Sequence, residues 1–240
     1  MSDLRPTEKK FEDHIESFLK SINYQSLHFS DYDRKLCLIP NVLIDFIKET
    51  QSDSWEELES KYGEDTESKI LQRISSEISK RGVIDVLRNK LVERGVYFDL
   101  VYFQPKSDLN MDHQRLYSSN KFSVVRQLHF STKNENSIDM GLFLNGIPLI
   151  TMELKNQLTG QNIVHSQKQY MTRESNEPLL KFKHCLVHFC VDNNKVSMTT
   201  DLNGFKTRFL PYNKNLENPP VKGFRTEYLW KEILTPVSIL

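Results

Sequence analysis

Three charged residues stand out because their types and spacing could do chemistry. Asp139 is followed by Glu153 and, one position beyond Leu154, by Lys155. Carboxylates are the hard oxygen ligands that Mg²⁺ prefers, and a lysine beside them can position or polarise an attacking water. These are the residue types of metal-assisted phosphodiester hydrolysis. The alternative is an ordinary solvated strand edge, but charged residues at the end of an apolar run need a reason.

A β-hairpin is predicted to bring the three residues together. Residues 138–144 and 149–155 alternate in polarity, and Asn145-Gly146 between them is a strong turn signal. For the aliphatic faces to coincide, Met140 must lie opposite Met152 and Leu144 opposite Pro148. This register leaves residues 145–147 as a three-residue loop, because a two-residue loop would bury Asp139 among aliphatic side chains.

In this register Asp139 lies opposite Glu153, with Lys155 on the same face. Two facing carboxylates repel one another, and a divalent cation removes the conflict. We therefore expect Asp139 and Glu153 to bind Mg²⁺, together with the Leu154 carbonyl oxygen. Lys155 would position or activate water and offset charge that develops on the phosphate.

Helices and strands on either side must hold this hairpin. The amphipathic pattern of residues 7–22 predicts a helix with Thr7 as its N-cap. Glu8 or Glu12 of that helix is an outside candidate for a further metal ligand. Residues 64–91 give the longest helical pattern, which Gly82 kinks or divides. Strands are expected at 97–104, 121–130, 184–191 and 195–200, a helix at 161–173 and a closing helix at 224–234, whereas 23–40, 106–119 and 203–220 read as loops. The order predicts an α/β fold with a mixed sheet flanked by helices.

The composition sets limits on the class of protein. The 240 residues contain 32 Lys and Arg and 32 Asp and Glu, so a nucleic-acid contact must come from a local basic patch. Cys37, Cys185 and Cys190 form no CxxC or His-paired pattern and read as free thiols of a reducing cytoplasm. No apolar run approaches the ~20 residues of a membrane span, and the N-terminus is not a signal peptide.

The block from Asp139 through NGIPLITMELKN resembles the PD-(D/E)xK nuclease motif. More narrowly, it is similar to the N-terminal nuclease domain of the restriction (R) subunit of type I restriction–modification enzymes. Other stretches support the resemblance: TEKKFEDHIESFLKSINY, NKFSVVRQLHF, LPYNK and GFRTEYLWKEIL. One departure concerns the family's Gln-x-x-x-Tyr, because Tyr170 has Ser166 four residues before it. Whether Gln167 or Gln169 takes the place of that Gln stays open.

The resemblance implies a restriction-endonuclease-like core with N-terminal helical additions. Residues 1–120 would form the helical region with the first helix and strand, 121–200 the nuclease core, and 201–240 a loop and helix leading to an ATP-driven translocase. No G-x-x-x-x-G-K-[ST] motif occurs, so ATP would belong only to a full-length subunit and this chain would be an endonuclease fragment. The implied setting is cytoplasmic, with DNA and the specificity and modification subunits as partners and no membrane.

The resemblance also assigns roles to individual residues. Asp139, Glu153, Lys155 and Tyr170 are the expected catalytic set, with Tyr170 steadying the site or a phosphate. Arg126, Lys168 and Arg173 are candidate DNA contacts. Two other hypotheses remain: a non-catalytic docking or DNA-binding module of the same assembly, which needs no metal, and a stand-alone DNA repair nuclease.

Overall fold

A computed structural model describes residues 8–106, 109–157, 160–221 and 223–240. Its centre is one seven-stranded mixed sheet with the order β1-β4-β5-β6-β7-β8-β9. β1 is parallel to β4 and β6 is parallel to β7, while the other neighbours are antiparallel. The strands are β1 Tyr24–Leu27, β4 Phe122–His129, β5 Ser137–Leu144, β6 Ile147–Leu154, β7 Val187–Val191, β8 Val196–Thr199 and β9 Leu210–Pro211. The expected mixed sheet flanked by helices is confirmed.

β6 is the central strand, and all eight of its residues are buried. A central strand is covered on both faces, which explains why its sequence is apolar almost throughout. Its predicted partner in β5 is confirmed, because Met140 lies opposite Met152. Glu153 and Leu154 therefore lie at the end of the most buried strand of the sheet, and Asp139 lies on the neighbouring strand β5.

The predicted hairpin loop is wrong in length. Leu144 pairs with Ile147 and Phe143 with Pro148, so the loop is the two residues Asn145-Gly146. Both have positive φ, 51° and 79°, as a type I′ turn requires. The register shifts between Leu142 and Phe143, and this β-bulge restores the Met140–Met152 pairing that the two-residue loop would otherwise displace.

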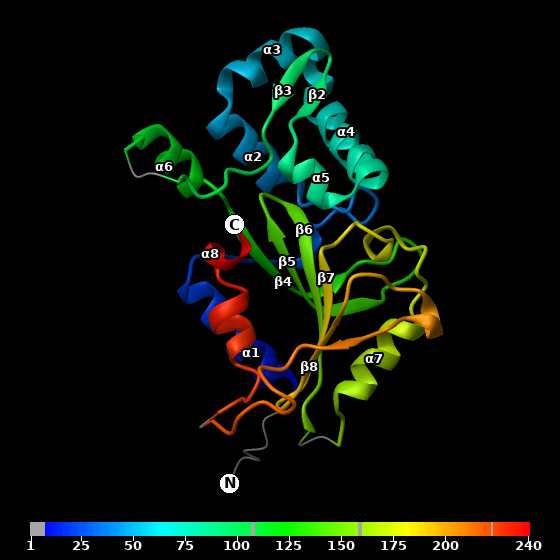
Figure 1. Cartoon of the computed structure of the whole chain (residues 1–240). Coiled ribbons are helices and arrows are strands. Elements are labelled where there is room, and N and C mark those ends of the chain that lie inside the picture. The colour runs from blue at the N-terminus through cyan, green and yellow to red at the C-terminus, as the bar shows by residue number, and fades with distance from the viewer. Residues whose placement is uncertain (1–7, 107–108, 158–159, 222) are drawn as a thin grey trace.

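Helices cover both faces of the sheet (Figure 1). On one face lie α1 (Glu8–Ser21) and, near the C-terminus, the π-helical turn η6 (Leu229–Ile233) and the short helix α8 (Pro236–Ile239). Phe11 and Trp230 of this layer share one hydrophobic core with Met152. On the other face α7 (Ile163–Thr172) packs on β6 and β7, and its Tyr170 belongs to a second core with Phe143. The start of the α1 prediction, the Thr7 cap, lies outside the described residues.

A helical addition stands at one end of the sheet (Figure 1). It consists of α2 (Pro40–Thr50), α3 (Ser52–Tyr62), α4 (Thr66–Arg81), α5 (Val83–Arg88) and the small hairpin of β2 (Leu91–Glu93) and β3 (Val96–Phe98). Gly82, with φ of 87°, separates α4 from α5, as the sequence predicts. The addition meets the sheet at the hairpin turn, where the Ile39 N–H donates to the Gly146 carbonyl at 2.8 Å.

All three predicted loops contain regular structure, and within residues 203–220 strand β9 pairs with β8. Residues 24–27 form edge strand β1, and α6 (Met111–Ser118) lies within the stretch read as a polar loop. β1 has no alternating apolar pattern of its own and is held by parallel pairing with β4. α6 begins at Asn110, whose side chain accepts from the Asp112 and His113 amides. Short 3₁₀ turns occur at Phe29–Asp31, Gly63–Asp65, Pro178–Leu180 and Gly204–Lys206.

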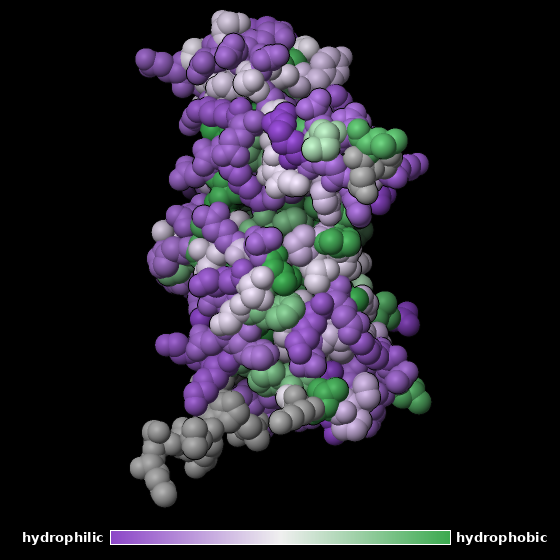
Figure 2. Space-filling model, turned by 90° about the vertical axis from the view of Figure 1, so that its left-hand side faces the viewer, coloured by the Kyte–Doolittle hydropathy of each residue, from purple (hydrophilic) through white to green (hydrophobic). Residues whose placement is uncertain are grey.

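The surface is mainly hydrophilic on the face shown in Figure 2, with hydrophobic side chains gathered across its middle. None of the helices in the described ranges is long and apolar enough to cross a membrane. Cys37, Cys185 and Cys190 are free and buried, as expected.

Candidate active site

Asp139 and Glu153 meet where the ladder between β5 and β6 ends. The last pair of the ladder is Met140 with Met152, one residue from each of the two acids. There the Asp139 carboxylate takes the place of a strand acceptor, because its Oδ2 accepts the Leu154 N–H at 2.7 Å. The predicted juxtaposition of the acids follows from this register, and the charge of Asp139 acts directly on Glu153.

Glu153 is a fully buried acid, with 0% of its surface exposed. Burial, and then the neighbouring charge of Asp139, raise the pKa of its carboxyl to about 8. Its Oε1 forms an ion pair with the Arg173 guanidinium. Its Oε2 is buried and has no hydrogen-bond partner among the described residues. The site thus contains a buried carboxyl oxygen that no described residue binds.

Lys155 approaches the same point from the end of β6. Its side chain is 6% exposed, and its Nζ lies 3.9 Å from Asp139 Oδ2. The ammonium also donates to the Leu154 carbonyl at 2.9 Å. The Lys155 N–H donates to Val191 O at 2.8 Å, which extends the pairing with β7 and fixes the lysine backbone. A cation, two carboxylates and a backbone carbonyl therefore converge, as the sequence predicts.

α1 adds a third acid near Asp139. Glu12 is 5% exposed, and burial raises the pKa of its carboxyl while Asp139 raises it further. Arg126 of β4 donates to Glu12 Oε2 at 2.9 Å and also pairs with Asp13 and Glu16. This arginine, a predicted DNA contact, is therefore engaged by three carboxylates of α1. Its role here is to fasten the helix beside the site.

Tyr170 lies in the layer behind the acids and not at the surface. Only 1% of it is exposed, and its hydroxyl is 2.7 Å from Thr151 Oγ1. Thr151 is two residues before Glu153 on β6, and its hydroxyl also lies 2.6 Å from His188 Nδ1. Tyr170 thus supports the strand that carries Glu153. In this structure it is too buried to reach a phosphate from solvent.

Three residues near Tyr170 on α7 are relevant to the question of which residue takes the place of the Gln in the Gln-x-x-x-Tyr pattern. Ser166 is fully buried, and its hydroxyl has no partner among the described residues. Gln167 points to β8, where its amide donates to Ser197 Oγ at 2.9 Å. Gln169 instead lines the same cleft as Arg173. Of the two glutamines, Gln169 is the one placed beside the Glu153–Arg173 pair.

A polar cleft of about 510 Å³ opens next to this pair. Its acidic residues are already paired: Glu135 with Arg34, Glu174 with Lys133, and Glu177 with the hydroxyls of Ser131 and Thr132. Arg173 is the one cation among the described residues that line it. The third predicted DNA contact, Lys168, is exposed on α7.

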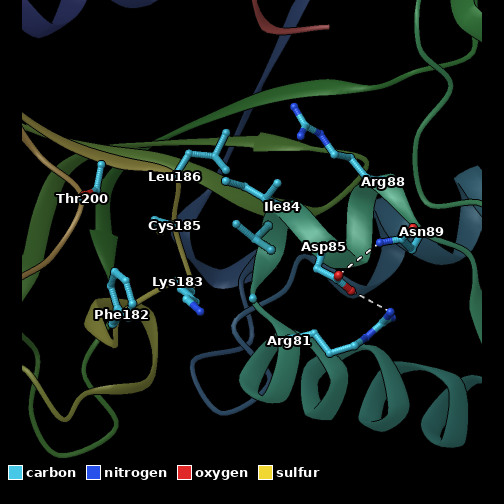
Figure 3. A pocket seen from close by; sticks show the side chains of 12 residues that line it. Arg81, Ile84, Asp85, Arg88, Asn89, Phe182, Lys183, Cys185, Leu186 and Thr200 are labelled. Carbon is cyan, nitrogen blue, oxygen red and sulfur yellow. Dashed lines mark hydrogen bonds and ion pairs between the residues drawn. The ribbon is translucent and has the colours of Figure 1, made fainter.

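A larger cavity of about 610 Å³ lies elsewhere (Figure 3). Its wall includes Leu186, whose N–H donates to Leu149 O, so it lies near the beginning of β6 and not at its acidic end. Among its described lining residues there is one acid, Asp85, which pairs with Arg81. This cavity lacks the paired carboxylates that the predicted chemistry requires.

The acid site fits a hard divalent cation in its donor set. Glu153 Oε2 is an orphaned buried oxygen, and Asp139 retains 17% exposure of its side chain. Among the described residues, no group of three or more His, Cys, Asp or Glu side chains is placed to hold a metal ion by itself. A two-carboxylate site suits Mg²⁺, which keeps several waters and is commonly bound by one or two carboxylates plus phosphate oxygens.

Arg173 as the partner of Glu153 is the feature that sequence reasoning missed. The sequence signal was weak, because Arg173 is the extended residue directly after α7 and helical spacing from Tyr170 does not place its side chain. The sequence alone did not show that this side chain lies at the end of β6.

Comparison with known proteins gives one result. The family model described as "Type I restriction enzyme R protein N terminus" matches residues 7–207. No curated protein matches the chain. The matched segment contains the whole acid site, from Glu12 on α1 to Arg173 at the end of α7.

Proposed function

The chain belongs to the family of type I restriction enzyme R protein N termini, and we propose that it is a Mg²⁺-dependent endonuclease domain that hydrolyses DNA phosphodiester bonds. Its mixed sheet with flanking helices is consistent with a restriction-endonuclease-like fold. The observation that carries the proposal is the buried Glu153 carboxyl group, which has one oxygen without a partner in the described ranges and which the charges of Asp139 and Lys155 influence.

Asp139, Glu153 and the Leu154 carbonyl are the proposed metal ligands. A divalent cation bound by these oxygens supplies Lewis-acid polarisation of a phosphoryl oxygen and favours deprotonation of an attacking water. For Leu154 to contribute, Lys155 Nζ must release the carbonyl oxygen that it now contacts at 2.9 Å. The backbone of the three residues is fixed by the sheet, so binding requires movement of side chains only.

Lys155 is the proposed group that acts on water and phosphate. Its Nζ, 3.9 Å from Asp139 Oδ2, would turn from the Leu154 carbonyl toward the reacting phosphate. There it would orient the attacking water and stabilise the charge that develops on the phosphoryl oxygens. Tyr170, through Thr151, holds the strand in place and is a positioning residue in this scheme.

DNA is the proposed substrate, with Lys168 as the surface contact. Phosphate contacts position a protein on DNA but carry no sequence information, so sequence choice would come from the specificity and modification subunits. Arg126 is no longer part of this proposal, because three carboxylates of α1 hold it.

Calorimetry of Mn²⁺ or Mg²⁺ binding tests the proposal on wild type and Asp139→Asn. The asparagine retains an oxygen that can accept the Leu154 N–H, so the strand end is preserved. We expect binding by wild type and a loss of at least tenfold in affinity in the variant, equivalent to about 1.4 kcal/mol. Equal binding by both proteins would reject the acid pair as the metal site. The non-catalytic docking module would then be the better reading.

A further inference from the structure

The ion pair between Glu153 and Arg173 is incomplete on both sides. Arg173 NH2 contacts Glu153 Oε1 and also donates to the Ser137 carbonyl at 2.6 Å. The Arg173 Nε is buried and no described residue accepts its hydrogen bond, and Glu153 Oε2 likewise has no donor in the described part of the chain. One donor and one acceptor of the same buried pair are therefore unused, although each could satisfy the other.

Another arginine in this chain shows the satisfied arrangement. Arg34 meets Glu135 with two parallel bonds, NH1 to Oε1 at 2.9 Å and NH2 to Oε2 at 2.7 Å. Bidentate pairing of this kind is the strong form of the interaction. A buried polar atom left without a partner costs about 1–3 kcal/mol, so an isolated buried pair should favour the bidentate form. At Glu153 one carboxyl oxygen instead has no partner among the described residues, and the charges of Asp139 and Lys155 act on the same group.

Gln169 is a candidate second partner for the Arg173 guanidinium. Gln169 lies in α7, and Arg173 is the extended residue that follows the helix. Both line the 510 Å³ polar cleft. Gln169 Oε1 is buried and has no hydrogen-bond partner among the described residues. The Phe130 ring lies 5.0 Å from the guanidinium and could keep this contact if the guanidinium turned toward Gln169.

We propose that Arg173 is an exchangeable partner of Glu153. In the metal-free protein it pairs with the buried Glu153 carboxyl group, and when a divalent cation binds Asp139 and Glu153 it leaves for the cleft and the Gln169 carbonyl oxygen. This inference rests on the metal site of the proposed function and adds a regulation of that site. Arg173 and the metal compete, so metal binding and the Arg173–Glu153 pair exclude one another.

Competition between Arg173 and the metal ion predicts that a substitution increases metal affinity. Removing Arg173 should strengthen metal binding, whereas a residue that merely supports the site would weaken binding when removed. Calorimetry with Mn²⁺ should show roughly tenfold tighter binding by Arg173→Gln than by wild type. Both proteins are titrated at pH 9 under the same conditions.

The matched control is Arg34→Gln, which removes an arginine paired with a glutamate of the same cleft without touching the acid site. Its affinity for Mn²⁺ should equal that of wild type. Gln169→Leu removes the second acceptor and should weaken Mn²⁺ binding several-fold. In the metal-free state its unfolding temperature should change no more than that of Arg34→Gln. Arg173→Lys keeps a cation on a shorter chain and serves if Arg173→Gln does not fold; it should also bind more tightly than wild type.

The outcomes separate the two proposals. Equal or weaker binding by Arg173→Gln at pH 9, with normal binding by wild type, would overturn the exchange while leaving the metal site intact. If neither wild type nor the variants bind Mn²⁺, both the exchange and the proposed nuclease site fail. A Gln169→Leu protein that binds like wild type would remove the second position from the proposal.

Discussion

At the scale of single residues, Glu153 occupies a place that is unfavourable for a carboxylate. It is fully buried, faces Asp139, and is balanced by Arg173 through one oxygen only. Burial of an unpaired charge is costly enough that such a group usually becomes neutral. A perturbed acid beside a specific charged partner is a common property of functional sites, and it is what the proposed metal would relieve.

The stability of the metal-free protein should therefore depend on the protonation of Glu153. Its pKa is about 8 in the fold against 4.5 for an unperturbed glutamate, so the folded state binds the extra proton between these values. The free energy of unfolding should fall as pH rises from 4.5 to 8, by at most about 1.4 kcal/mol per pH unit from this group. Below pH 4.5 the protonated Glu153 makes its full contribution to the free energy of unfolding, and above pH 8 this contribution is lost.

Glu153→Gln isolates this effect. The glutamine cannot ionise, so urea unfolding in the presence of EDTA should show wild type losing stability relative to the variant across that window. Parallel curves for the two proteins between pH 4.5 and 8 would show that Glu153 is ionised throughout.

Lys155 should act on the reaction and not on metal binding. Lys155→Met keeps the length and apolar stem of the side chain but removes the ammonium, which lies 3.9 Å from Asp139. We expect cleavage of supercoiled plasmid to fall at least a hundredfold, since loss of one electrostatic group at a transition state commonly costs about 10²–10³ in rate. Mn²⁺ affinity, measured by calorimetry, should change less than tenfold.

Lys48→Met is the control for the loss of a lysine. Lys48 pairs with Glu67 in the helical addition, far from the acids in the fold. If both substitutions reduce cleavage equally, Lys155 has no specific role in the reaction.

At the scale of elements, the β5–β6 hairpin decides where the acids stand. Its turn is packed under the helical addition, and Asn145 is fully buried. The Asn145 side chain accepts the Lys121 N–H at 2.7 Å and donates to the Leu100 carbonyl at 3.0 Å. These bonds tie the turn to β4 and to the chain leaving the addition. The bulge at Leu142 then aligns Asp139 with the end of β6.

Gly146→Ala should destabilise the protein far more than the same change in another turn of the same type. Gly146 has φ of 79°, and an added Cβ would lie 2.5 Å from Ile39 O and 3.0 Å from Leu43. Gly95, in the β2–β3 turn, has φ of 81° but nothing within 4 Å of an added Cβ. In the control Gly95→Ala the free energy of unfolding should fall by about 1–2 kcal/mol, because alanine disfavours a positive φ.

Urea unfolding of the two variants separates the steric part from the backbone part. The free energy of unfolding should fall by about 1–3 kcal/mol more in Gly146→Ala than in Gly95→Ala, which is the usual cost of overpacking a filled interior. Similar losses in both would mean that α2 shifts freely away from the turn.

At the scale of the whole molecule, one hydrophobic core joins the helical addition to the sheet and its covering helices. The same cluster contains Trp55 and Phe98 of the addition, Leu142 and Met152 of the sheet, and Trp230 of the C-terminal layer. A shared core of this kind has no internal boundary at which one part could open alone. We infer that the addition and the sheet unfold together.

The two tryptophans allow this to be measured. Trp55 reports on α3 and Trp230 on the layer against α1, so Trp230→Phe and Trp55→Phe each leave one probe. In each variant the fluorescence midpoint in urea should coincide with that of the far-ultraviolet circular dichroism. An earlier fluorescence transition from Trp55 alone would show that the addition is a separate folding unit.

The sequence by itself determined the local features of this protein. Short-range chemistry predicts the positive-φ turn at Asn145-Gly146, the division of the long helix at Gly82 and the pairing of Met140 with Met152. Each depends on backbone preference or on the alternation of neighbouring side chains, and both are determined by residues close together in the sequence.

Only the tertiary structure decided what depends on distant segments. The loop length was predicted wrongly because a β-bulge offsets the register shift of a two-residue loop. No local sequence pattern indicated this bulge. Edge strand β1 exists through its pairing with β4, nearly a hundred positions later. Arg126 and Arg173 read as free cations until the fold placed carboxylates beside them. An ion pair across the chain is set by packing, because the charges attract wherever the core brings them together.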